Sequence, residues 1–83
     1  MSTKEKLIER FKAQPKDFTF DELVRIFEMC GYIIDNKGHT SGSRVRFKRN
    51  DSFFACHKPH PGNIVNRATL KDAYTFLLLK GLM

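Results

Sequence analysis

Residues 43–56 read SRVRFKRNDSFFAC, and this stretch decides the fold. In its first half, charged residues alternate with Val45 and Phe47, which is the period of a β-strand with one buried face and one solvated face. Residues 49–51 (Arg-Asn-Asp) predict a turn, and residues 52–56 predict a returning strand. The stretch therefore predicts a β-hairpin whose solvated face carries the bases Arg44, Arg46 and Lys48.

The phenylalanines are expected mainly to fill the core. The chain has eight of them, and rings in strands and amphipathic helices more often pack inside than form a base-stacking surface. Phe53 and Phe54 are adjacent in one predicted strand, so their side chains point to opposite faces. One of the two must face away from the helices, where it is a candidate contact for a partner.

Three helices are predicted around the hairpin. The first runs from Thr3 to about Ala13, on the helical spacing of its apolar residues. In the second, Thr19 and Glu22 have the spacing of a capping box, and Gly31 is expected to end the helix. The third begins with Thr69 as its cap and ends at Gly81.

The remaining segments complete an α+β domain. Tyr32–Ile34 is β-prone, and the two prolines within residues 57–63 predict a rigid loop. The order is helix, helix, strand, strand, strand, helix. With 83 residues the chain is expected to form a single domain, residues 1–83.

Composition excludes several protein classes. The longest apolar run, Phe76–Leu79, is far shorter than the roughly 20 residues that cross a bilayer, so no membrane contact is expected. The first residues lack the apolar stretch of a signal peptide. Cys30 and Cys56 do not have the dense spacing of a disulfide-rich secreted scaffold. A reducing cytoplasm is the simplest expectation.

Positive charge is concentrated in the middle of the chain. Residues 37–67 hold seven bases and one acid, a net charge of +6, whereas the flanks hold eight of each. A localised basic segment attracts a polyanion, and a merely solubilising surface is the alternative. Six bases are the candidate RNA contacts: Lys37, Arg44, Arg46, Lys48, Arg49 and Lys58. A basic face poor in exposed aromatics suits double-stranded RNA, which is read by shape and backbone.

A series of short motifs resembles the HicA toxin family. They are Gly31-Tyr32 after a helix, Gly42-Ser43-Arg44 opening a basic strand, His60-Pro61-Gly62, and Thr69-Leu70 opening the last helix. The resemblance implies a core over residues 18–83 that is like the double-stranded RNA-binding domain, with a three-stranded antiparallel sheet. Residues 1–17 are then an N-terminal helical addition. It also implies a bacterial cytoplasmic endoribonuclease toxin that cleaves mRNA, with a HicB-like antitoxin as partner.

The sequence departs from the family pattern at the position of the catalytic histidine. The family pattern is Gly-Ser-His with a catalytic histidine, and here Arg44 stands in that third position. His39, five residues earlier, is the candidate catalytic base, because imidazole has an unperturbed pKa of about 6.5. The alternatives for His39 are a solvated loop histidine and a residue that only contacts RNA. His57 and His60 are further candidates, with ordinary loop histidines as their alternative.

No cofactor and no metal are expected. A zinc site built from Cys56, His57 and His60 would need Cys30 as its fourth ligand, and the chain lacks paired-cysteine spacing. RNA cleavage would therefore be metal-independent. Two other functions remain open: a non-catalytic RNA-binding module of the same fold, and a protein-interaction domain that meets an acidic partner.

Overall fold

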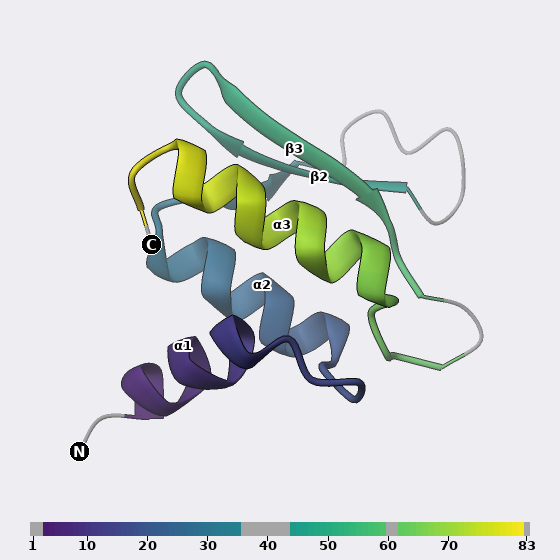
Figure 1. Cartoon of the computed structure of the whole chain (residues 1–83). Coiled ribbons are helices and arrows are strands. Elements are labelled where there is room, and N and C mark those ends of the chain that lie inside the picture. The colour runs from purple at the N-terminus through teal and green to yellow at the C-terminus, as the bar shows by residue number, and fades with distance from the viewer. Residues whose placement is uncertain (1–2, 36–43, 60–61, 83) are drawn as a thin grey trace.

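Two helices cover one face of a three-stranded sheet, and a third helix packs on the side of one of them that faces away from the sheet (Figure 1). The structure is a computed structural model and describes residues 3–35, 44–59 and 62–82. Its elements are α1 (Thr3–Ala13), α2 (Phe20–Met29), β1 (Ile33–Asp35), β2 (Arg44–Arg49), β3 (Ser52–His57) and α3 (Arg67–Leu79). The strands are antiparallel in the order β1-β2-β3. α2 and α3 lie against the sheet, and α1 lies beyond α2 (Figure 1). The predicted α+β fold and element order are confirmed.

α2 begins with the predicted capping box. The Thr19 hydroxyl accepts a hydrogen bond from the backbone N–H of Glu22 (3.1 Å), and the Glu22 carboxylate accepts one from the backbone N–H of Thr19 (2.8 Å). Each bond satisfies a donor that the first helical turn would otherwise leave open.

Arg10 connects α1 to this cap. Its Nε donates to the Glu22 carboxylate at 2.9 Å, and its Nη2 donates to the Asp17 carboxylate at 2.9 Å. Partial burial alone would raise the pKa of Glu22, but the hydrogen bonds from Thr19 and Arg10 outweigh it, so the pKa is lowered. The charged form of Glu22 is thus the one that the fold stabilises.

This arrangement predicts a pH-dependent contribution to stability. A depressed carboxyl pKa stabilises the fold above the unfolded value, about 4.3, and the contribution is lost as the pH falls through the folded value. Glu22→Gln keeps an amide that can cap the helix but removes the charge. It should therefore lower the free energy of unfolding at pH 7, by less than the roughly 1 kcal/mol expected for Thr19→Ala.

The measurement is urea unfolding followed by circular dichroism at pH 7 and pH 3. The difference between Glu22→Gln and the wild type should shrink at pH 3. Glu9→Gln, at an exposed position of α1, is the matched control. An equal loss for both variants at pH 7 would contradict the role of Glu22.

Gly31 terminates α2, as predicted: the last helical residue is Met29, and Gly31 follows the C-cap Cys30. The backbone N–H of Gly31 donates to the Glu28 carbonyl (3.0 Å) and that of Tyr32 to the Phe27 carbonyl (2.9 Å), which is a Schellman motif. Gly31 has a φ of +91°, a conformation that a side chain disfavours. The chain then enters β1 one residue later than predicted, because Tyr32 turns into the core instead, where it is 1% exposed.

The hairpin is confirmed, with one correction at its turn. Arg49 was predicted to lie in the turn, but it is the last residue of β2 and pairs with Ser52. Two residues suffice for the turn because Asn50 adopts a φ of +52°, which asparagine tolerates.

α3 begins earlier than predicted. Its N-cap is Asn66, whose side-chain oxygen accepts a hydrogen bond from the backbone N–H of Thr69 at 2.8 Å. The predicted cap at Thr69 was wrong because asparagine, among the best N-capping residues, lies three positions upstream. The buried face of α3 consists of Leu70, Ala73 and Leu77, which are at most 1% exposed.

Aromatic rings form the centre of the core. Phe27 stacks on Phe47 with the ring centroids 4.2 Å apart and meets Tyr32 edge-on at 5.4 Å. α1 extends this core through Phe11, which is fully buried and lies 5.6 Å from both Phe18 and Tyr74. None of the helices in the described ranges is long and apolar enough to cross a bilayer.

Candidate nucleic-acid interface

The sheet has one face covered by helices and one face open to solvent. Val45 and Phe47 point to the helices and are 7% and 0% exposed. The alternation of a strand therefore places Arg46 and Lys48 on the opposite face, where both are exposed. We call this the outer sheet face. Its described side chains, given by the register and burial, are Ile33, Arg46, Lys48, Phe53, Ala55 and His57.

Phe53 lies on the outer sheet face between two cations. Its ring is 47% exposed. The guanidinium carbon of Arg46 is 4.9 Å from the ring centroid, and the Lys48 ammonium is 5.9 Å from it. Both distances fall within the range of cation–π attraction. The ring thus holds two positive groups close together on an open surface.

The structure decides which ring of the Phe53-Phe54 pair faces away from the helices. Phe54 is the ring that turns inward, 5.3 Å from Phe27 and 5.1 Å from Phe76. Because adjacent strand residues face opposite ways, Phe53 is left outside. The doublet predicts one outward ring, but only the packing against α2 and α3 decides which.

The predicted RNA-contacting bases do not all share this face. Arg46 and Lys48 do. Arg49 lies on the helix side, next to Gly31. A Cβ atom built on that glycine would be 3.1 Å from the Nε atom of Arg49. A cation there stabilises the carbonyl end of α2.

Lys58 is exposed just after β3. Arg44 opens β2 opposite His57, but its side chain is outside the described part of the structure, as is the whole of Lys37. The positive charge of the middle segment is therefore distributed over more than one face, and the described cations of the outer sheet face are Arg46 and Lys48.

Of the three candidate histidines, His57 is the one described. It is exposed at the end of β3, on the outer sheet face. His39 and His60 lie outside the described residues. In the zinc alternative, Cys56 and His57 would bind one ion, yet they point to opposite faces of β3. Within residues 3–35, 44–59 and 62–82, no three His, Cys, Asp or Glu residues gather as a metal site would require.

The two thiols are kept protonated by their surroundings. Burial raises the pKa of Cys56 to about 11. Burial also raises the pKa of Cys30, and the nearby Arg49 charge only partly opposes it. Because the thiolate is the nucleophilic form, burial makes both cysteines poor nucleophiles at neutral pH.

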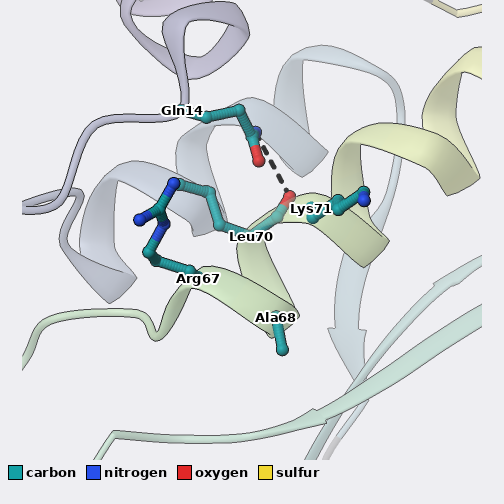
Figure 2. Close-up of a pocket in the computed structure, with 5 residues that line it drawn as sticks. All are labelled: Gln14, Arg67, Ala68, Leu70 and Lys71. Atoms are coloured by element: carbon teal, nitrogen blue, oxygen red, sulfur yellow. Dashed lines mark hydrogen bonds between the residues drawn. The ribbon is translucent and has the colours of Figure 1, made fainter.

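A pocket on the helix side has no connection to these residues. It has a volume of about 270 Å³ and lies between the end of α1 and the first turns of α3 (Figure 2). The Gln14 amide donates to the Leu70 carbonyl across it, at 3.4 Å. Arg67 and Lys71 also line it, but none of the candidate site residues does.

Comparison with known families gives a match over most of the chain. The family model described as the HicA toxin of bacterial toxin-antitoxin covers residues 20–78. The chain belongs to the HicA toxin family. The match begins at the first residue of α2 and ends within α3, so the HicA region includes the whole sheet and excludes α1. No curated protein and no solved structure matches the chain.

Membership makes the protein a toxin of the toxin-antitoxin type, which pairs with an antitoxin. The predicted family is thereby confirmed. In this HicA chain, the cations and the ring of the outer sheet face all come from the β2–β3 hairpin.

Proposed function

We propose that this HicA-family toxin acts on RNA in the bacterial cytoplasm, binding the sugar-phosphate chain on the outer sheet face and cleaving it without a metal. The observation that supports binding is the pairing of Arg46 and Lys48 around the exposed ring of Phe53. Together they offer positive charge and apolar area on one open surface, which matches the two parts of a nucleotide.

The spacing of the cations suits a phosphate chain. Alternate residues of a strand are about 7 Å apart, and neighbouring strands are about 5 Å apart. Arg46 and Lys48 are such alternate residues. Because their side chains are long and flexible, their charged groups can match phosphate spacings between these two distances. Contacts of this kind release counterions from the RNA, so binding should weaken as salt increases.

The proposed cleavage is an internal transfer within the RNA. A base takes the proton of a 2′-hydroxyl, the 2′-oxygen attacks the adjacent phosphorus, and the bond to the 5′-oxygen breaks as that oxygen gains a proton. The products are a 2′,3′-cyclic phosphate and a free 5′-hydroxyl. Cations stabilise the extra negative charge on the phosphate in the transition state. His39 is the proposed base, and His57 and His60 are the other candidates for this role.

A non-catalytic RNA-binding module is the second candidate. The observation that favours it is Arg44, which occupies the position where the family pattern has its catalytic histidine. Incubation of the purified protein with a long RNA in EDTA distinguishes the functions. Fragments support the metal-independent nuclease, a gel shift without fragments supports the binding module, and neither result supports a domain that meets only an acidic protein.

The proposed antitoxin partner is HicB-like. The exposed cations of the outer sheet face favour a partner that presents acidic side chains, because complementary charge speeds association and selects the partner. An antitoxin seated there would cover the RNA-binding residues and so silence the toxin.

Removing both cations of the outer sheet face tests the proposed binding surface. The double variant Arg46→Ala/Lys48→Ala should bind RNA about tenfold more weakly or worse at moderate salt. The plot of log affinity against log salt has a negative slope. This slope should become less negative by about 1.4 to 2, because two phosphate contacts are lost. Fluorescence anisotropy with a labelled RNA at several salt concentrations measures both quantities.

A charge-matched control separates this surface from net charge. Lys12→Ala/Lys16→Ala removes the same charge from exposed positions on and just after α1. It should leave the affinity within about twofold, since exposed charges distant from the site are screened by salt. Equal losses in the two double variants would show that the outer sheet face is not the site.

A further inference from the structure

We infer that the RNA contacted by the outer sheet face is unpaired, with one base stacked on the ring of Phe53 and the neighbouring phosphate held by Arg46 and Lys48. This inference rests on the proposed RNA binding and names its substrate class as single-stranded RNA.

The exposure of the ring is the first observation. The adjacent Phe54 is packed among the core rings, whereas Phe53 is 47% exposed on the edge strand β3, opposite Lys48 of β2. Its neighbour two residues along β3 is Ala55, which is also exposed and has too small a side chain to cover the ring. Part of the aromatic ring is therefore accessible from solvent.

The flanking charges are the second observation. Arg46 and Lys48 lie 4.9 Å and 5.9 Å from the ring centroid. Within one nucleotide, a phosphate and a base are separated by a single ribose, a spacing of the same order. A base on the ring thus brings its own phosphate to the two cations. The planar guanidinium of Arg46 can both stack and bind phosphate.

A duplex does not offer this combination. In double-stranded RNA the base faces are stacked inside, and the accessible surface consists of sugars, phosphates and base edges. A protruding ring would meet no base face there. The sequence favours double-stranded RNA on the premise that the basic face is poor in exposed aromatics. The exposed ring of Phe53 removes that premise.

The test compares one sequence in two forms. A short unstructured RNA with 2′-fluoro sugars, which lack the hydroxyl needed for cleavage, is used alone and annealed to its 2′-fluoro complement. Wild-type protein should bind the single strand more tightly. Phe53→Leu retains an apolar side chain but loses the aromatic face, so binding to the single strand should weaken about 5- to 150-fold. Phe53→Tyr keeps the ring and should stay within about threefold.

Two further measurements make the result specific. Leu79→Ala, at an apolar position that is 82% exposed at the end of α3, should leave binding unchanged. A 5-iodouridine in the single strand should cross-link on irradiation to Phe53, as located by mass spectrometry. Single-strand affinity that is the same for Phe53→Leu and wild type, or a preference for the duplex, would overturn the inference.

Failure of the inference is distinguishable from failure of the proposed function. If Arg46→Ala/Lys48→Ala weakens RNA binding but Phe53→Leu does not, the outer sheet face binds RNA and the stacked base is wrong. If wild-type protein binds neither form of the RNA at low salt, the proposed function and the inference both fail.

Discussion

The His39→Ala variant should cleave RNA about 10²- to 10⁴-fold more slowly than the wild-type chain, which is the usual contribution of a positioned general base. The base must be unprotonated to accept the 2′-hydroxyl proton. The wild-type rate should therefore rise with pH as the imidazole loses its proton, and the rate of the variant should not. The measurement is the time course of cleavage of a labelled RNA in EDTA.

His57→Ala and His60→Ala are the matched controls for this prediction. Each removes one imidazole from the same part of the chain, and His57 is exposed on the outer sheet face. RNA binding by the His39→Ala variant should remain near the wild-type level, since the proposed loss is in proton transfer. An unchanged cleavage rate in His39→Ala removes this residue from the mechanism, and a large loss in His57→Ala alone would transfer the role to that histidine.

Phe27→Ala should have the largest effect on stability, lowering the free energy of unfolding by about 3–5 kcal/mol. Phe27 is fully buried and contacts four other rings: Phe47 of β2, Phe54 of β3, Phe76 of α3, and Tyr32, which lies between α2 and β1. Truncation of Phe27 to alanine loses the free energy gained by burying the ring. It also leaves a cavity between the helices and the sheet that their side chains cannot fill completely.

The expected loss is large compared with the total. At about 0.05–0.15 kcal/mol per residue, a domain of this length has roughly 4–12 kcal/mol of stability. Phe27→Ala should therefore be partly or wholly unfolded, as seen by circular dichroism and by the urea midpoint. Phe27→Leu retains most of the volume and should lose less. Leu79→Ala, at a largely exposed site, should change stability by no more than about 0.5 kcal/mol. A loss below about 1 kcal/mol for Phe27→Ala would show that the aromatic cluster does not centre on this ring.

Local chemistry explains which predictions from the sequence were confirmed. The capping box of Thr19 and Glu22, the helix end at Gly31 and the alternation around Phe47 all depend on hydrogen bonds or sterics within a few residues. The errors came where two local signals competed. Asn66 and Thr69 can each cap a helix, and Asn66 does so because the helix extends upstream to Arg67.

The candidate site was predicted in part. The bases Arg46 and Lys48 were placed on the solvated face by their spacing, and the structure puts them there. Arg49 was grouped with them by composition. A count of charges does not say where the side chains point. Arg49 follows Lys48 in β2, so its side chain points to the opposite face of the sheet.

The type and order of the helices and strands follow from local patterns in the chain, as do the two faces of β2 and the presence of one outward ring in the Phe53-Phe54 pair. Only the tertiary structure decided that Phe53 is the exposed ring, that Arg49 turns to the end of α2 and that α1 joins the core through Phe11. The physical reason is that periodicity defines faces, whereas the helices that cover one of them decide which face is buried.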